Sequence, residues 1–150
     1  MAIDTYTPLL SEVLKKVHNA KTKAKKVELL RQYDCEPLRM VLKASFDPNI
    51  VWLLPEGDVP FKANESAEGT EHTVLRRESR KLYRFVKGGD DTLPQAKREH
   101  MFIQMLEGLH KSEADLVVAA KDKKLHQVYK GLSAAVVKEA FGWNDNFIRS

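Results

Sequence analysis

The sequence predicts a mainly α-helical protein, folded as one compact multi-helix domain over residues 1–150. Apolar residues recur at the i, i+3, i+4 spacing of helix faces through most of the chain. Residues that favour helix starts precede these periodic stretches, and glycines or prolines follow them. The one β-prone run, residues 50–54, lies in an extended, turn-rich segment over residues 48–69 that could hold a short strand.

Three helices are predicted in the first third of the chain. Thr7 is a suitable N-cap for the first, with Pro8 at the first helical position. The second spans residues 21–33. Asp34 is a suitable N-cap for the third, which ends at Asp47 because a proline follows. The residues predicted to face the core are Leu10, Val13, Leu14, Val17, Val27, Leu30, Tyr33, Leu38, Val41, Leu42 and Phe46.

Four more helices are predicted in the second half, each with a start or stop signal at its ends. The starts are Ser or Thr hydroxyls that can accept a hydrogen bond from the first turn, and the stops are glycines. The first of them spans residues 70–87 and stops at Gly88-Gly89, and the second is capped by Thr92 with Pro94 in its first turn. The third spans residues 113–123, with Ser112 and Asp115 as an approximate capping box. The fourth spans residues 134–141, between Ser133 and Gly142.

The composition, the single cysteine and the lack of membrane or signal segments together predict a cytosolic protein. The formal net charge is +4 and 43% of residues are hydrophobic, as in an ordinary soluble domain with a mildly basic surface. Cys35 is the only cysteine, which fits a reducing compartment. No apolar run approaches the roughly 20 residues of a membrane span. The first residues lack the basic and apolar regions of a secretory signal.

A basic stretch stands out in the predicted helix over residues 70–87. Six basic residues occupy the twelve positions from 76 to 87, and Glu78 is the only acid among them. A solvated helix face explains why charges gather away from apolar residues, but it does not explain their common sign, since like charges at (i, i+4) repel. We therefore predict a nucleic-acid-binding surface. The alternative, pairing with the acids of residues 56–71, stays open. The candidate residues are Arg76, Arg77, Arg80, Lys81, Arg84 and Lys87.

A second basic tract lies near the junction of the first two helices. It contains only lysines, which are common on solvated surfaces and are a weaker sign of phosphate binding than arginines. Its members are Lys15, Lys16, Lys21, Lys23, Lys25 and Lys26.

Catalytic and metal-binding motifs are not found in the sequence, and no cofactor is predicted. The five histidines lack zinc-site spacing, one cysteine cannot build a thiolate site, and no glycine-rich phosphate loop is present. The sequence therefore predicts a non-enzymatic protein. The histidines are His18, His72, His100, His110 and His126.

Four aromatic residues are candidates for contact with a protein partner. Trp52 and Phe61 lie in the turn-rich segment, where they are also expected to anchor it to the helices. Trp143 and Phe147 lie in the tail, residues 143–150. Such a tail can dock in a partner's groove or fold back on the core. We predict that it folds back, with Phe147 and Ile148 at least partly packed.

Several long strings resemble an uncharacterised family of small proteins in tailed phages, notably myophages of marine cyanobacteria. Examples are "DCEPLRMVLKASFDPNIVWLLPEGDVPF", "MFIQMLEGLHKSEADLVVAAKDKKL" and "YKGLSAAVVKEAFGW". The resemblance covers most of the chain from about residue 19 onward. It implies a phage gene product made in the host-cell cytoplasm, and it carries no activity or catalytic residue with it.

Three functions follow as expectations. The first is a phage accessory protein that binds nucleic acid, or a nucleic-acid-processing complex, through the basic helix face. The second is an adaptor or inhibitor of a host or phage protein complex, which would use Trp52 and the aromatic tail. The third is a virion structural protein, which mass spectrometry of purified particles would detect.

Overall fold

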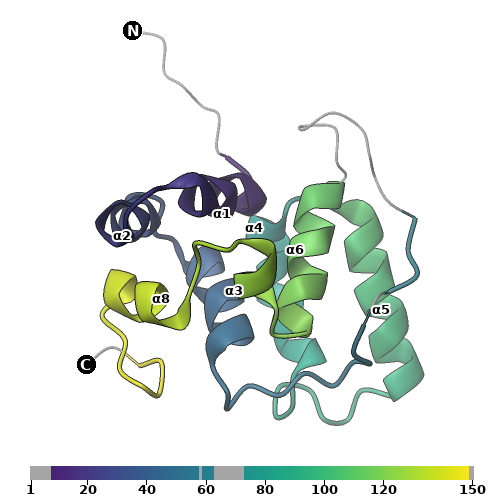
Figure 1. Cartoon of the computed structure of the whole chain (residues 1–150). Helices are drawn as coiled ribbons and strands as arrows, with labels where there is room; N and C mark the ends of the chain where they lie inside the picture. The colour runs from purple at the N-terminus through teal and green to yellow at the C-terminus, as the bar shows by residue number, and fades with distance from the viewer. Residues whose placement is uncertain (1–7, 58, 63–72, 149–150) are drawn as a thin grey trace, which may run out of the picture.

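A computed structural model of the chain describes residues 8–57, 59–62 and 73–148. In these residues the structure is built from helices without a β-sheet, so the predicted mainly α fold is confirmed (Figure 1). The helices are α1 (Leu10–Asn19), α2 (Lys23–Gln32), α3 (Glu36–Phe46), α4 (Leu75–Glu78), the 3₁₀ helix η1 (Ser79–Phe85), α5 (Gln95–Gly108), α6 (Lys111–Lys121), α7 (Leu125–Val128) and α8 (Ala134–Phe141).

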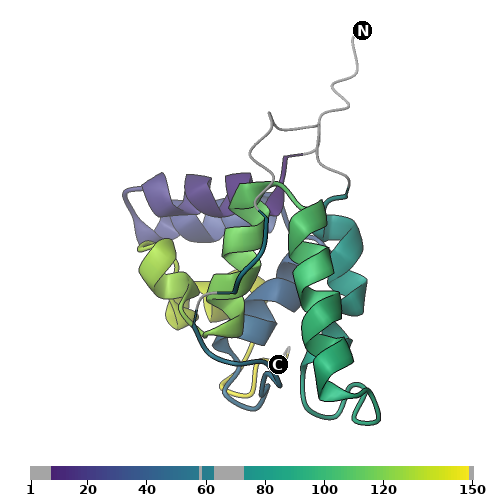
Figure 2. The same ribbon diagram turned by 90° about the vertical axis from the view of Figure 1, so that its right-hand side faces the viewer.

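The helices surround one apolar core. α1 and α2 lie side by side at one end, α8 packs against α2, and α3 runs through the middle beside α6 (Figures 1 and 2). α5 lies at the opposite edge, next to α6. Buried leucines from α1, α2, α3, α5 and α6 form a single cluster, which Phe85 and Phe102 join through an edge-to-face contact at 5.1 Å.

The predicted ends of α8 are confirmed, and α2 has a cap that was not predicted. The Thr22 hydroxyl accepts a hydrogen bond from the Lys25 N–H at 3.1 Å, and the Ser133 hydroxyl accepts one from the Val136 N–H at 3.3 Å. Gly142 ends α8 in the left-handed region, with φ of 66°. Thr7 lies outside the described residues. α1 begins at Leu10, where the Glu12 carboxylate accepts from the N–H of Leu9 at 2.9 Å.

Two predicted caps are wrong because their side chains bind other groups. Asp34 pairs with Arg39, and α3 starts from Cys35. Thr92 donates to Asp90 in the preceding turn, and α5 begins only after Pro94.

The predicted capping box of α6 is also wrong. The N-cap is His110, whose Nδ1 accepts from the Ser112 N–H at 3.1 Å. Ser112 therefore lies inside the first turn of the helix. A histidine can cap in this way because an unprotonated ring nitrogen is a hydrogen-bond acceptor.

The turn-rich segment crosses from the end of α3 towards α5 (Figure 2). Its described part contains a single bridge, Trp52 with Val86, in place of a strand. The Trp52 indole N–H donates to the Ala44 carbonyl at 2.9 Å, and its ring meets Phe102 edge-on. Phe61 is half-buried and packs on the core. Both aromatic residues therefore anchor the segment, as expected.

Two lysines, one at the end of α6 and one just after it, bind backbone carbonyls in and before this segment. The Lys121 ammonium group is buried and donates to the carbonyls of Pro55 and Gly57, at 2.7 and 3.1 Å. Lys123 donates to the carbonyls of Ala44 and Asp47. Burial lowers the pKa of Lys123, and the Asp47 carboxylate partly offsets this effect.

Glu113 joins three helix N-termini. Its carboxylate is fully buried and accepts from the N–H of Leu10, at the start of α1, at 3.0 Å. It also accepts from the N–H of Leu75, at the start of α4, at 2.9 Å, while it lies in the first turn of α6 itself. Helix N-termini carry partial positive charge, so their convergence stabilises this buried anion.

Burial, followed by the charges of Asp115 and Glu113, raises the pKa of Tyr129 to about 12.

The tail folds back on the protein. Phe147 is 3% exposed, and Trp143 is half-buried between Phe141 and Phe147, with ring centroids 5.0 and 6.0 Å away. The expected packing of Ile148 is wrong: its side chain is 58% exposed. The reason is local, because Phe147 has φ of 58° and the chain turns there, so that the next side chain points to solvent.

Arg31 connects α2 to the end of α8. Its guanidinium donates to the carbonyls of Ala140 and Glu139, at 3.1 and 3.0 Å. These carbonyls belong to the last turn of α8, which has no intrahelical donors for them. The contact fixes α8 against α2.

Candidate nucleic-acid interface

The basic stretch does not form one α-helix. Within the described residues it comprises the single α-turn of α4 followed by the 3₁₀ helix η1. Neighbouring groups bind the backbone carbonyls at its end: Arg98 donates to the carbonyl of Arg84 at 2.9 Å, and the N–H of Leu53 donates to that of Phe85 at 2.8 Å. These tertiary contacts hold the segment in a tighter helix than the sequence pattern predicts.

A 3₁₀ helix has three residues per turn, so side chains three apart share an edge. The inner edge of η1 consists of Ser79, Leu82 and Phe85, all buried. Arg80 and Tyr83 share a second edge, which is exposed. Lys81 and Arg84 share the third. The predicted basic helix face is therefore divided between two edges of η1.

Of the six predicted basic residues, Arg76 does not face solvent freely. Its guanidinium is half-buried and donates to the carbonyl of Pro8 at 3.1 Å and to the sulfur of Cys35 at 3.0 Å. The remaining five define what we call the basic surface. Arg77, Arg80, Lys81 and Lys87 are exposed, and Arg84 is half-buried.

Few carboxylates neutralise the basic surface. Lys81 pairs with Glu78 at 3.3 Å. Within the described residues, the side chains of Arg77, Arg80 and Lys87 have no carboxylate partner. The alternative of pairing with acids of residues 56–71 is untested, since most of those acids lie outside the described residues.

A groove of about 280 Å³ separates η1 from α5, and we call it the η1–α5 groove. Its floor is apolar, and its rim carries cations and one amide. Glu78 is one of its lining residues, is 9% exposed and also accepts from the Thr73 hydroxyl. The lining residues are Glu78, Lys81, Arg84, Phe85, Met101, Gln104 and Met105.

The lysine tract is partly used within the fold. Lys23 pairs with Glu139 at 3.2 Å, Lys25 pairs with Glu28 at 3.3 Å, and the Lys16 ammonium lies over the Tyr33 ring. Lys26 is half-buried against Gly131. Lys15 and Lys21 are exposed.

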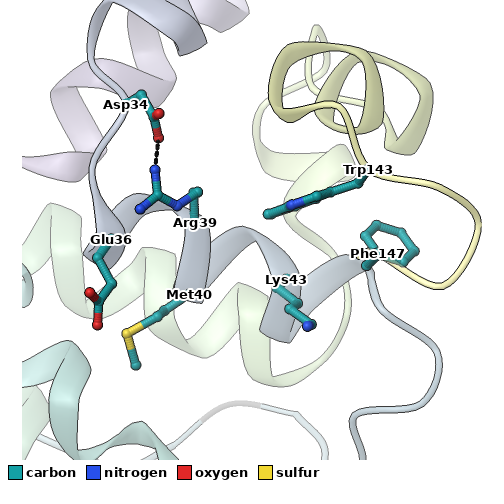
Figure 3. A pocket seen from close by; sticks show the side chains of 7 residues that line it. All are labelled: Asp34, Glu36, Arg39, Met40, Lys43, Trp143 and Phe147. Atoms are coloured by element: carbon teal, nitrogen blue, oxygen red, sulfur yellow. Dashed lines mark hydrogen bonds and ion pairs between the residues drawn. The ribbon is translucent and has the colours of Figure 1, made fainter. Parts of the chain in front are cut away.

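The tail forms a second groove with α3, and we call it the tail groove. It has a volume of about 580 Å³. The Trp143 ring reaches from the tail towards Arg39 and Lys43 on α3, and Phe147 lies beside it (Figure 3). Asp34, paired with Arg39, lies at the far side. The lining residues are Asp34, Glu36, Arg39, Met40, Lys43, Trp143 and Phe147.

The histidines occupy separate places in the described chain. His110 caps α6, and the Nδ1 of His18 accepts from the N–H of Lys130 at 2.8 Å. His100 and His126 are exposed, and His72 lies outside the described residues. No three histidine, cysteine or acidic side chains within the described ranges gather as metal ligands would. Likewise, the helices that the structure describes are too short or too polar to cross a membrane.

Sequence reasoning missed Tyr83 as part of the site. It is the one aromatic residue with an exposed side chain in the described part of the chain, at 46%. The guanidinium of Arg84 lies 5.5 Å from the centre of its ring and donates to its hydroxyl at 3.0 Å. This hydrogen bond raises the pKa of Arg84. An aromatic residue inside a basic run was a signal that could have identified it.

The fold and surface define a small, mainly α protein with an exposed basic patch and without a known three-dimensional relative: no solved structure matches the chain. The chain belongs to a family of unknown function (DUF6433), whose model matches residues 13–127. The match contains the whole basic surface and the η1–α5 groove, and it ends before α8 and the tail. No curated protein matches.

Proposed function

We propose that the protein is a non-enzymatic phage accessory protein that binds nucleic acid, or a nucleic-acid-processing complex, through the basic surface in the host-cell cytoplasm. The observation that carries this is the group formed by Arg77, Arg80 and Lys87, exposed and without carboxylate partners within the described residues. The phage setting is supported by the sequence strings that resemble phage proteins.

The chemistry of the surface suits phosphate. Guanidinium groups bind phosphate oxygens through two parallel hydrogen bonds, and they stay charged at any physiological pH. When exposed cations of a protein neutralise phosphates, the counterions condensed on the nucleic acid are released, and this release is the main source of non-specific affinity.

Replacing the two exposed arginines of the basic surface, Arg77 and Arg80, should abolish most of the nucleic-acid binding. We expect wild-type protein to bind random DNA or RNA at low salt, with affinity that falls as salt rises. The Arg77→Glu/Arg80→Glu variant should bind at least about tenfold more weakly. Its log–log salt slope on duplex should be shallower by about 1.8, since each lost phosphate contact removes about 0.9. Fluorescence anisotropy with labelled oligonucleotides measures both quantities.

A matched control is available on α1 and the loop that follows it. Lys15→Glu/Lys21→Glu changes the net charge by the same amount at exposed positions away from the basic surface. It should weaken binding much less. Equal losses in the two double variants would contradict the assignment, and absence of binding even at low salt would remove it.

A protein–protein adaptor is a second candidate, supported by the tail groove. Its wall combines the half-buried Trp143 with Met40 and with charged groups on α3, a mixture typical of interface hot spots. This proposal concerns a host or phage protein complex as the partner.

The tail-groove candidate is tested by a pull-down from infected-cell lysate treated with nuclease. A protein partner should be retained by the wild type and lost with Met40→Glu, because a carboxylate placed in the groove opposes docking of an apolar side chain. Recovery unaffected by Met40→Glu argues against the tail groove. A partner lost on nuclease treatment supports the nucleic-acid function instead.

A further inference from the structure

We infer that the basic surface takes single-stranded nucleic acid, stacking one base on the Tyr83 ring and placing a neighbouring base in the η1–α5 groove. This inference rests on the proposed function and specifies its ligand. It adds Tyr83 and Gln104, which no charge pattern identifies, to the basic residues.

Tyr83 is presented as a fixed platform. Its ring is 46% exposed and lies on the same edge of η1 as Arg80. The Tyr83 carbonyl lies close against Gly89, where a side chain is excluded because a Cβ atom would overlap the carbonyl oxygen. Arg84 contacts both the ring and the hydroxyl. A large ring that is exposed to water and contacted by a guanidinium is available for stacking.

The charges around the groove separate the positions of phosphates and bases. The Glu78 carboxylate lines the η1–α5 groove and disfavours a phosphate there. Arg77 and Arg80 do not line the groove, have no carboxylate partner in the described chain and suit the phosphates. The groove floor of Phe85, Met101 and Met105 suits the flat face of a base.

The groove rim also offers hydrogen bonds to a base edge. The Gln104 amide is exposed at the rim and can both donate and accept. A volume of about 280 Å³ admits one planar base. These groups would recognise a base that has left its stack.

Single strands fit this arrangement better than duplexes. In a duplex the faces of the bases are covered by their neighbours, so Tyr83 and the groove floor would have nothing to contact. Only the cations would then bind. An aromatic platform beside a cationic edge is the usual arrangement for single-stranded nucleic acid.

The test compares single-stranded DNA, single-stranded RNA and duplex DNA of equal length by anisotropy, with wild type, Tyr83→Ala and Tyr83→Phe. We expect a single strand to bind more tightly than the duplex. Tyr83→Ala should lose about tenfold or more of the single-strand affinity, the effect of one base–aromatic stack, with duplex binding unchanged. Tyr83→Phe should retain wild-type affinity, because the ring is kept. Circular dichroism checks that both variants fold.

The outcomes separate this inference from the proposed function. Equal affinity for duplex and single strands, or single-strand binding unaffected by Tyr83→Ala, overturns the inference and leaves the phosphate-binding function in place. Loss of single-strand and duplex binding in equal measure with Tyr83→Ala also overturns it. Absence of binding to all three probes overturns the proposed function itself.

Discussion

Replacing Glu113 with alanine is expected to lower the free energy of unfolding by about 2–6 kcal/mol, because two buried N–H donors lose their acceptor. The substitution removes the acceptor for the N–H groups of Leu10 and Leu75, which are buried and 65 positions apart along the chain. A buried donor left without a partner costs about 1–3 kcal/mol. Urea denaturation followed by circular dichroism measures the change.

Glu113→Gln should also be destabilising. An amide offers one oxygen in place of two, and its NH₂ group would face one of the two backbone N–H donors. Asp115→Asn on the same helix is the control: Asp115 is exposed and pairs with Lys111 at the surface, so the change should stay within about 0.5 kcal/mol. A loss below about 1 kcal/mol with Glu113→Ala would show that the junction is not a main source of stability.

Ending the chain after Gly142 is expected to cost about 3–5 kcal/mol, the usual cost of losing a large buried aromatic side chain. The truncation removes Phe147, which is 3% exposed, and Trp143, which covers Phe141. That is a large part of the ~5–15 kcal/mol that stabilises a small domain. Thermal and urea melts of the shortened chain measure it.

Ile148→Ser provides the control, since Ile148 is 58% exposed and its replacement should leave the melting temperature within about a degree. A truncated chain with the same melting temperature as the wild type would contradict the packed tail. Loss of a protein partner without loss of stability would then favour the adaptor function over nucleic-acid binding.

The helical fold could be predicted because its signals are local. The Ser133 cap and the left-handed Gly142 at the two ends of α8 each depend on residues within one turn. Apolar periodicity also placed the buried faces of α1 and α3 correctly. Where local signals competed, as at Asp34, the contact with Arg39 decided the outcome.

The site could be predicted only in part, because its shape depends on distant partners. The basic residues are visible in the sequence, but Arg98 and Leu53, which bind the end of η1, are not part of that pattern. A shift from 100° to 120° per residue regroups the side chains, so the basic face predicted for an α-helix is divided between two edges. Arg76 is turned inward by Pro8, 68 positions away.

The contacts of Leu10 and Arg31 show that the region shared with the family is smaller than the unit that folds. The matched residues 13–127 leave out Leu10, one of the donors to Glu113, and all of α8, whose last carbonyls Arg31 binds. A fragment cut at these limits would expose to water the face of α2 that α8 covers, and it would leave the Arg31 guanidinium without its acceptors. Any protein that shares only the matched span must close this face by other means.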